Sequence, residues 1–176
     1  MIERRHRSDD SASLALYSEC EAYRYGLERV WDSGHGALAF VMLNPSTATE
    51  LRNDPTIERC ERRARAMGYG GLRIVNLFAF RATQPADLRR AADPVGAEND
   101  AILVEWCGGA RDVIAAWGVH GALLGRAAEV APLLPPQTLH LGLTKAGHPR
   151  HPLYVSYARQ PAPRPLAARY ATPGER

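Results

Sequence analysis

Cysteines, lysines and long apolar runs are scarce in this sequence, and each shortage excludes a class of protein. Cys20, Cys60 and Cys107 lie far apart without a C-x-x-C pair, so we expect neither a disulfide framework nor a four-cysteine zinc or iron–sulfur site. There is no stretch of about 18 apolar residues, which predicts that no segment spans a membrane. Residues 1–7 are charged and lack the apolar centre of a signal peptide, so we expect a cytoplasmic protein.

The motifs of several enzyme classes are absent as well. The sequence has no G-x-S-x-G nucleophile elbow, no P-loop and no G-x-G-x-x-G after the first buried run. His148 and His151 are close together, but neither a third histidine nor a paired carboxylate accompanies them. We therefore expect no metal site, and no cofactor.

Lys145 is the only lysine, so arginine supplies nearly all of the 22 basic residues behind the net charge of +3. Arginine suits contacts to phosphates and base edges. A GC-rich genome would also encode a chain rich in arginine and alanine, so the charge alone leaves a nucleic-acid partner open.

A length of 176 residues with 45% hydrophobic and 23% charged residues predicts one globular domain with a real core. We expect an irregular N-terminal segment over 1–18, a single α/β domain over 19–157 and a flexible Pro/Arg-rich tail over 158–176. The expected oligomeric state is a monomer.

Continuous apolar runs alternate with helical patterns along the domain. The runs predict buried strands over 37–43, 72–78, 112–117 and 138–143. Asp54-Pro55 is a strong helix start, and helical patterns recur over 101–106 and 120–134. Polar–apolar alternation over 23–31 predicts a further strand that pairs as an antiparallel edge. The α/β class follows, as a three-layer α/β/α sandwich around a central four-stranded parallel sheet.

The first of these strands ends abruptly at Asn44-Pro45. Pro45 restricts Asn44 to an extended or turn conformation, and Thr47-Ala48-Thr49-Glu50 predicts a capping box that opens a short helical turn. An ordinary strand-to-helix turn would explain the same residues. A functional role gains support because the later strands also end in polar residues.

These strand ends are expected to meet, because ligands bind outside the carboxyl ends of the strands in open parallel sheets. The polar endings predict one cleft lined by Asn44-Pro45, Asn76 with Arg81, Trp117-Gly118 and residues 144–154. The cleft contains asparagine, histidine, arginine and lysine, but no obvious nucleophile. Asparagine can orient a water or hydrogen-bond an amide-like edge, and a histidine in a Pro-flanked turn can hydrogen-bond a developing oxyanion.

Five short motifs together resemble a family of small proteins catalogued as a domain of unknown function, over roughly residues 20–157. They are Asn44-Pro45-Ser46-Thr47, Asp54-Pro55-Thr56, Val75-Asn76-Leu77-Phe78, Ala116-Trp117-Gly118 and Arg150-His151-Pro152-Leu153-Tyr154. Four of them are also similar, more weakly, to motifs of the uracil-DNA glycosylase superfamily. That similarity implies a uracil-DNA glycosylase-like fold and a metal-independent DNA base glycosylase acting on uracil or a related deaminated or modified base.

The same resemblance implies roles for particular residues once a nucleotide is flipped into the cleft. Asn44 would orient the attacking water, and His151 would stabilise negative charge on the departing base. The base would be bound by Asn76, Phe78 and Pro45. Contacts to single- or double-stranded DNA would come from Ser46, Thr47, Arg81, Lys145, Arg150, Leu153 and Tyr154, with Leu153 or Tyr154 acting as a wedge in the duplex.

The sequence departs from the superfamily pattern at several places. Met42-Leu43 stands where the superfamily has a glycine-containing pair. Phe78 and Phe80, the candidates to stack on the base, are equally plausible as core residues. The loop has two His-Pro pairs, so His148 could take the role that the resemblance gives to His151. Each of these residues also has a plainer explanation. Asn76 could be a buried amide that hydrogen-bonds backbone groups, and Trp117 could be a core residue. Arg81 and Arg150 could be surface residues, and Asp54 could be a helix cap.

Two other functions fit the same residues. An N-glycosidase of free nucleosides or nucleotides would use the same chemistry without a wedge, and a non-catalytic module would bind nucleic acid or a modified base without cleaving it. The sequence leaves open which base is bound and whether single or double strands are preferred.

Overall fold

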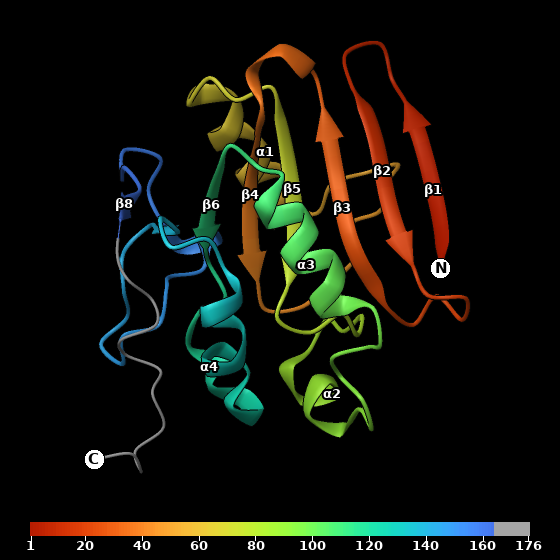
Figure 1. The fold of residues 1–176 in the computed structure, drawn as a ribbon, viewed down its shortest axis with the longest axis vertical. Helices are drawn as coiled ribbons and strands as arrows, with labels where there is room; N and C mark the ends of the chain where they lie inside the picture. The colour runs from red at the N-terminus through yellow and green to blue at the C-terminus, as the bar shows by residue number, and fades with distance from the viewer. Residues whose placement is uncertain (164–176) are drawn as a thin grey trace.

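The computed structural model describes residues 1–163, which form helices packed around one sheet (Figure 1), and this sheet has eight strands. The strand order across the sheet is β1-β2-β3-β5-β4-β6-β7-β8. Its strands are β1 (Ile2–Arg7), β2 (Ala12–Tyr17), β3 (Arg24–Val30), β4 (Ala37–Met42), β5 (Gly71–Asn76), β6 (Asp112–Ala115), β7 (Leu139–His140) and β8 (Ala162–Pro163).

The sheet is mixed rather than parallel throughout. β4 pairs in parallel with β5 and β6, and β6 pairs in parallel with β7. β1, β2 and β3 add an antiparallel meander beyond β5, and β8 adds an antiparallel strand beyond β7. The α/β class is therefore confirmed, but the sheet has eight strands of mixed direction in place of the four parallel strands that we predicted.

The N-terminal segment over 1–18, which we expected to be irregular, instead forms β1 and β2. All side chains of β1 except Ile2 are exposed, and most are charged. Such a strand lacks the polar–apolar alternation that identifies strands in a sequence, and charge on an edge strand discourages pairing with other chains. The missing alternation concealed β1, and without β1 and β2 we placed β3 at an edge that it does not occupy.

The helices only partly follow the sequence patterns. They are α1 (Pro55–Ala66), α2 (Pro85–Arg90), α3 (Asn99–Gly108) and α4 (Arg126–Val130). Residues 47–50 form no helical turn, so the capping box predicted there is wrong. The single helix predicted over 120–134 is broken into the 3-10 segment η2 (Val119–Gly125), α4 and the 3-10 segment η3 (Ala131–Leu133). Leu124 and Gly125, with φ of 54° and 68°, interrupt it.

Apolar residues fill both faces of the sheet. Alternate side chains of β4 point to opposite faces, so Ala39 and Val41 join α3 in one core while Phe40 packs with α1 in the other. Burial on both faces explains why β4 and its neighbours are continuous apolar runs in the sequence.

The structure also bears on two other predictions, the flexible C-terminal tail and the lack of a membrane-spanning segment. β8 lies within the region 158–176 that we expected to be a flexible tail, and residues 164–176 of that tail lie outside the described residues. Within residues 1–163, every helix is too short or too polar to cross a bilayer.

Gly70 offers a sharp test of the packing between β5 and the turn before β4. A Cβ at this position would lie 1.6 Å from the backbone oxygen of Asp32, and the Gly70 N–H donates to Gly36 O at 2.8 Å. We expect Gly70→Ala to lower the free energy of unfolding by about 3 kcal/mol, because neither backbone can move freely. Urea unfolding measures the change in free energy, and an m-value equal to that of the wild type shows that stability alone has changed.

Gly108 is the matched control. It is the last residue of α3, is exposed, and a Cβ there meets no described atom within 4 Å. Gly108→Ala should raise the free energy of unfolding by about 0.5 kcal/mol, because alanine restricts the unfolded chain and favours the helix. Equal effects at both positions would contradict this account of Gly70.

Candidate functional site

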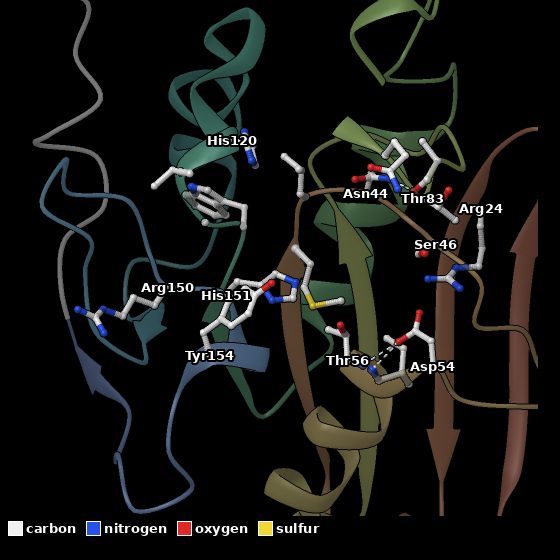
Figure 2. Close-up of a pocket in the computed structure, with 18 of the residues that line it drawn as sticks. Arg24, Asn44, Ser46, Asp54, Thr56, Thr83, His120, Arg150, His151 and Tyr154 are labelled. Atoms are coloured by element: carbon white, nitrogen blue, oxygen red, sulfur yellow. Dashed lines mark hydrogen bonds between the residues drawn. The ribbon is translucent and has the colours of Figure 1, made fainter. Parts of the chain in front are cut away.

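A cavity of about 560 Å³, which we call the strand-end cavity, opens at the carboxyl ends of the parallel strands (Figure 2). Its lining comprises Arg24, Met42, Leu43, Asn44, Ser46, Asp54, Thr56, Ile57, Ala82, Thr83, Gln84, Trp117, Gly118, Val119, His120, Thr144, Arg150, His151 and Tyr154. Segments that follow β4, β5, β6 and β7 all contribute, as the topology predicts.

The position of β4 between β5 and β6 explains why a cavity lies here. The chain leaves β4 through α1 on one face of the sheet and leaves β5 through α3 on the other. Connections that depart to opposite faces leave a crevice at the strand ends, which is where ligands bind in open α/β sheets.

Asn44 is fixed by its amide nitrogen. Nδ2 donates to Pro45 O at 2.9 Å and to Ala82 O at 2.8 Å. Because both partners are carbonyl oxygens, the orientation of the amide is determined: Nδ2 faces the backbone, and Oδ1 remains available as an acceptor. A second link between the same loops, from Ala82 N to Pro45 O at 3.0 Å, supports this arrangement.

Asp54 and Thr56 come from the start of α1. Asp54 is the N-cap, and its Oδ1 accepts from Thr56 N and Ile57 N, both at 2.9 Å. The predicted helix start at Asp54-Pro55 is thus confirmed. The same carboxylate lines the strand-end cavity, so capping and a role in the site are compatible.

His151 is half-buried, and its surroundings favour the neutral form. Burial holds its pKa below the ordinary value of 6.5, and the charge of Asp54 only partly opposes this. Nδ1 accepts a long hydrogen bond of 3.4 Å from Leu153 N, which assigns the ring proton to Nε2. A neutral His151 with a proton on Nε2 can donate a hydrogen bond to a ligand.

The loop that carries His151 is held from α1. Arg59 donates through Nε to Pro152 O at 3.0 Å and through Nη2 to Val155 O at 2.7 Å. Gly118 lies on the other side: its φ is 72°, and a Cβ there would be 3.6 Å from the Cβ of His151. Trp117-Gly118 and His151 thus form neighbouring parts of the lining.

Tyr154 lies at the mouth of the strand-end cavity with 80% of its surface exposed. Its ring lies 5.8 Å from that of His151, centroid to centroid. Figure 2 shows Tyr154 and Arg150 on the side of the cavity formed by the loop after β7.

A second, more open cavity of about 710 Å³, which we call the side cavity, adjoins the first. Ser46, Thr47 and Arg81 line it, and it shares Ser46, Ala82 and Thr83 with the strand-end cavity. Three residues predicted to contact DNA are therefore brought together beside the main site.

Other predicted residues do not line either cavity. Asn76 and Phe78 are fully buried, Pro45 is buried, Leu153 is half-buried, and Lys145 is exposed away from the lining. Phe78 packs in the core on the α3 face. The side-chain amide of Asn76 has no hydrogen-bond partner among residues 1–163.

Arg24 was not among the predicted site residues, yet it lies in the wall of the cavity with 1% of its surface exposed. The feature of the sequence that could have identified it was an arginine at the start of the alternating polar–apolar run over 23–31. An edge strand would expose such a side chain, but β3 lies between β2 and β5 and Arg24 is buried there.

No group of three or more His, Cys, Asp or Glu side chains lies close enough to hold a metal ion in the described part of the chain. The arrangement instead offers an anchored acceptor at Asn44, a neutral donor at His151 and charged groups at Asp54 and Arg24.

The lowered pKa of the half-buried His151 predicts a pH dependence of stability. As the pH falls through about 6.5, the unfolded chain gains a proton at this residue before the folded chain does, so folding becomes less favourable. We expect the loss of unfolding free energy between pH 7.5 and 5.5 to be smaller in His151→Gln than in the wild type. Urea unfolding at the two pH values measures it, and identical losses would show that His151 does not titrate below its ordinary range.

Comparison with known proteins identifies the family. No curated protein and no solved structure matches the chain, and nothing in these comparisons supports the weaker similarity to uracil-DNA glycosylases. A family model described as "Protein of unknown function (DUF1643)" matches residues 24–153. This span begins at Arg24 and includes Asn44, Asp54 and His151, and it covers most of the 176 residues. The chain therefore belongs to this family, as the five motifs predicted.

Proposed function

We propose that the protein hydrolyses the N-glycosidic bond between a deoxyribose and a nucleobase that has been flipped out of DNA. The observation that carries this proposal is the pairing of Asn44 and His151 across one cavity. Asn44 presents an acceptor and His151 presents a donor, and each is held by a backbone contact on its far side.

The reaction needs these two functions. Water attacks the sugar carbon, the bond to the base nitrogen breaks, and its electron pair leaves with the base. Asn44 Oδ1 accepts a hydrogen bond from the water and aims it at the sugar carbon. His151 Nε2–H donates to the base as negative charge develops on it. The proton released by the water passes to solvent or to the base. Asp54 lies in the same lining and is the second group that can orient the water.

Features around the opening favour DNA as the substrate. Tyr154 is an exposed aromatic at the mouth and is suited to fill the space that a flipped nucleotide leaves in the stack. The side cavity brings Arg81 together with the hydroxyl groups of Ser46 and Thr47. An arginine and two hydroxyls are suitable donors to the phosphates that flank the flipped nucleotide.

A free nucleoside or nucleotide is the second candidate substrate. A volume of about 560 Å³ is within the range of sites that enclose an entire small-molecule ligand. This alternative keeps the roles of Asn44 and His151 but needs neither Tyr154 nor the side cavity.

A panel of oligonucleotides, each with one damaged or deaminated base, tests the activity. The wild type should release free base from at least one of them, and Asn44→Ala and His151→Ala should each lower the rate at least about 100-fold, because each removes one group that stabilises the transition state. Chromatography of the released base measures the rate. His35→Ala is the control: this exposed histidine precedes β4, at the end of the strand opposite the cavity, and its loss should leave the rate unchanged.

The alternatives give different results in the same panel. Release from free nucleosides but not from DNA would support the second substrate class. Salt-sensitive DNA binding without release would indicate a non-catalytic module. If Asn44→Ala retained the full rate while the wild type was active, its water-orienting role would be wrong.

Tyr154 allows a separate test of the DNA substrate. Tyr154→Ala should lower release from duplex DNA about tenfold and from single strands much less, because only a duplex must be kept open. Tyr154→Phe is the matched variant and should keep the wild-type rate, since the ring and not the hydroxyl fills the gap. Equal losses on both substrates would exclude the wedge role.

A further inference from the structure

Arg24 brings a buried positive charge to the wall of the strand-end cavity. Figure 2 shows its guanidinium pointing into the cavity between Ser46 and Asp54. Burial lowers the pKa of Arg24 to about 10, so the side chain stays charged at neutral pH. A buried charge is costly unless an opposite charge and hydrogen bonds compensate it.

The protein satisfies only part of this guanidinium. Nη1 donates to Ala48 O, while Nε has no hydrogen-bond partner among residues 1–163. Over the same residues, no carboxylate oxygen lies within 4.0 Å of the Arg24 guanidinium. Because an arginine carries five N–H donors in a planar fork, most of its capacity remains for a ligand.

Asp54 only partly compensates this charge. Among residues 1–163 it is the one acidic residue that lines the cavity, and its Oδ1 already accepts two N–H groups at the start of α1, where the helix dipole also stabilises a negative charge. Arg24 and Arg150 both line the cavity, so arginines outnumber acidic residues there. Nearby charges act on Arg24 in both directions: Tyr17 and Asp54 raise its pKa, and Arg81 and Arg29 lower it to a smaller extent.

We propose that Arg24 forms an anion subsite in this cavity and binds an oxyanion group of the ligand. That group is either a phosphate on the sugar or a charged oxygen on the base. Ser46 and Thr56 line the same cavity and provide neutral hydroxyl donors beside it. The inference concerns binding alone, so it stands or falls independently of any cleavage of an N-glycosidic bond.

Two pairs of probes, each differing in one anionic group, test the proposal by calorimetric titration of the full chain. Uracil is compared with orotate, whose carboxylate is on the ring, and uridine is compared with its 5′-monophosphate. The wild type should bind the anionic member of one pair at least about tenfold more tightly than the neutral member. The pair that shows the preference identifies where the ligand carries its charge. Equal binding within both pairs, or no binding of any probe or of inorganic phosphate, overturns the proposal.

Variants assign the preference to Arg24. Arg24→Gln should reduce the anionic-to-neutral affinity ratio to about twofold or less, because the amide keeps a donor but not the charge. Arg24→Lys keeps the charge and should retain a clear preference. If folded Arg24→Gln keeps the wild-type preference for the anionic probe, Arg24 does not form the anion subsite. If Arg24→Gln does not fold, the comparison of anionic with neutral probes in the wild type still tests the proposal.

Arg29 provides a matched control. It is also a buried arginine of β3 and also holds the loop after β4, through Thr49 O and Asn53 Oδ1, but it does not line the cavity. Arg29→Gln should keep the wild-type ratio. If it lost the preference as Arg24→Gln does, the effect would belong to the loop and the anion subsite would be rejected.

Discussion

Hydrogen bonds from arginine side chains to backbone carbonyl groups hold the loops around the cavity. Arg24 and Arg29 bind carbonyls of the loop between β4 and α1, and Arg59 and Arg63 bind carbonyls of the segment that follows His151. Loops packed against a core have backbone groups that regular secondary structure does not satisfy, and these groups need other partners. A planar guanidinium reaches two or more carbonyls from one anchored side chain, which a lysine cannot do as well. The arginine bias of the sequence therefore has a structural use, whatever its genomic origin.

The candidate site residues share one design. Each uses one polar atom to fix its orientation against the backbone and leaves the other atom for a ligand. Asn44 is anchored by Nδ2, Asp54 by Oδ1 and His151 by Nδ1. Groups held in this way lose little freedom when a ligand or a transition state forms, which is the basis of electrostatic preorganisation. The arrangement is suited to chemistry that depends on positioning rather than on a covalent nucleophile.

Some of this site could be predicted from local sequence, and some could not. The ends of β4 and β6 and the loop with His151 were predictable, because continuous apolar runs identify buried parallel strands and such strands end at a common edge. Asn76 sits at a strand end in the same way, yet its side chain is fully buried and is absent from the cavity lining. The period of a strand specifies alternate faces, but the depth of a residue depends on what packs above it.

Local sequence patterns were enough to predict the α/β class, the family, the helix start at Asp54-Pro55 and the meeting of four strand ends. These follow from local patterns: apolar periodicity, capping chemistry and short motifs. Tertiary contacts, in contrast, were needed to show that β1 and β2 extend the sheet and that β3 is an interior strand. That placement buries Arg24 and turns an ordinary strand arginine into a charged wall of the cavity. The physical reason is that burial is a property of neighbours far apart in the chain, and no local pattern specifies them.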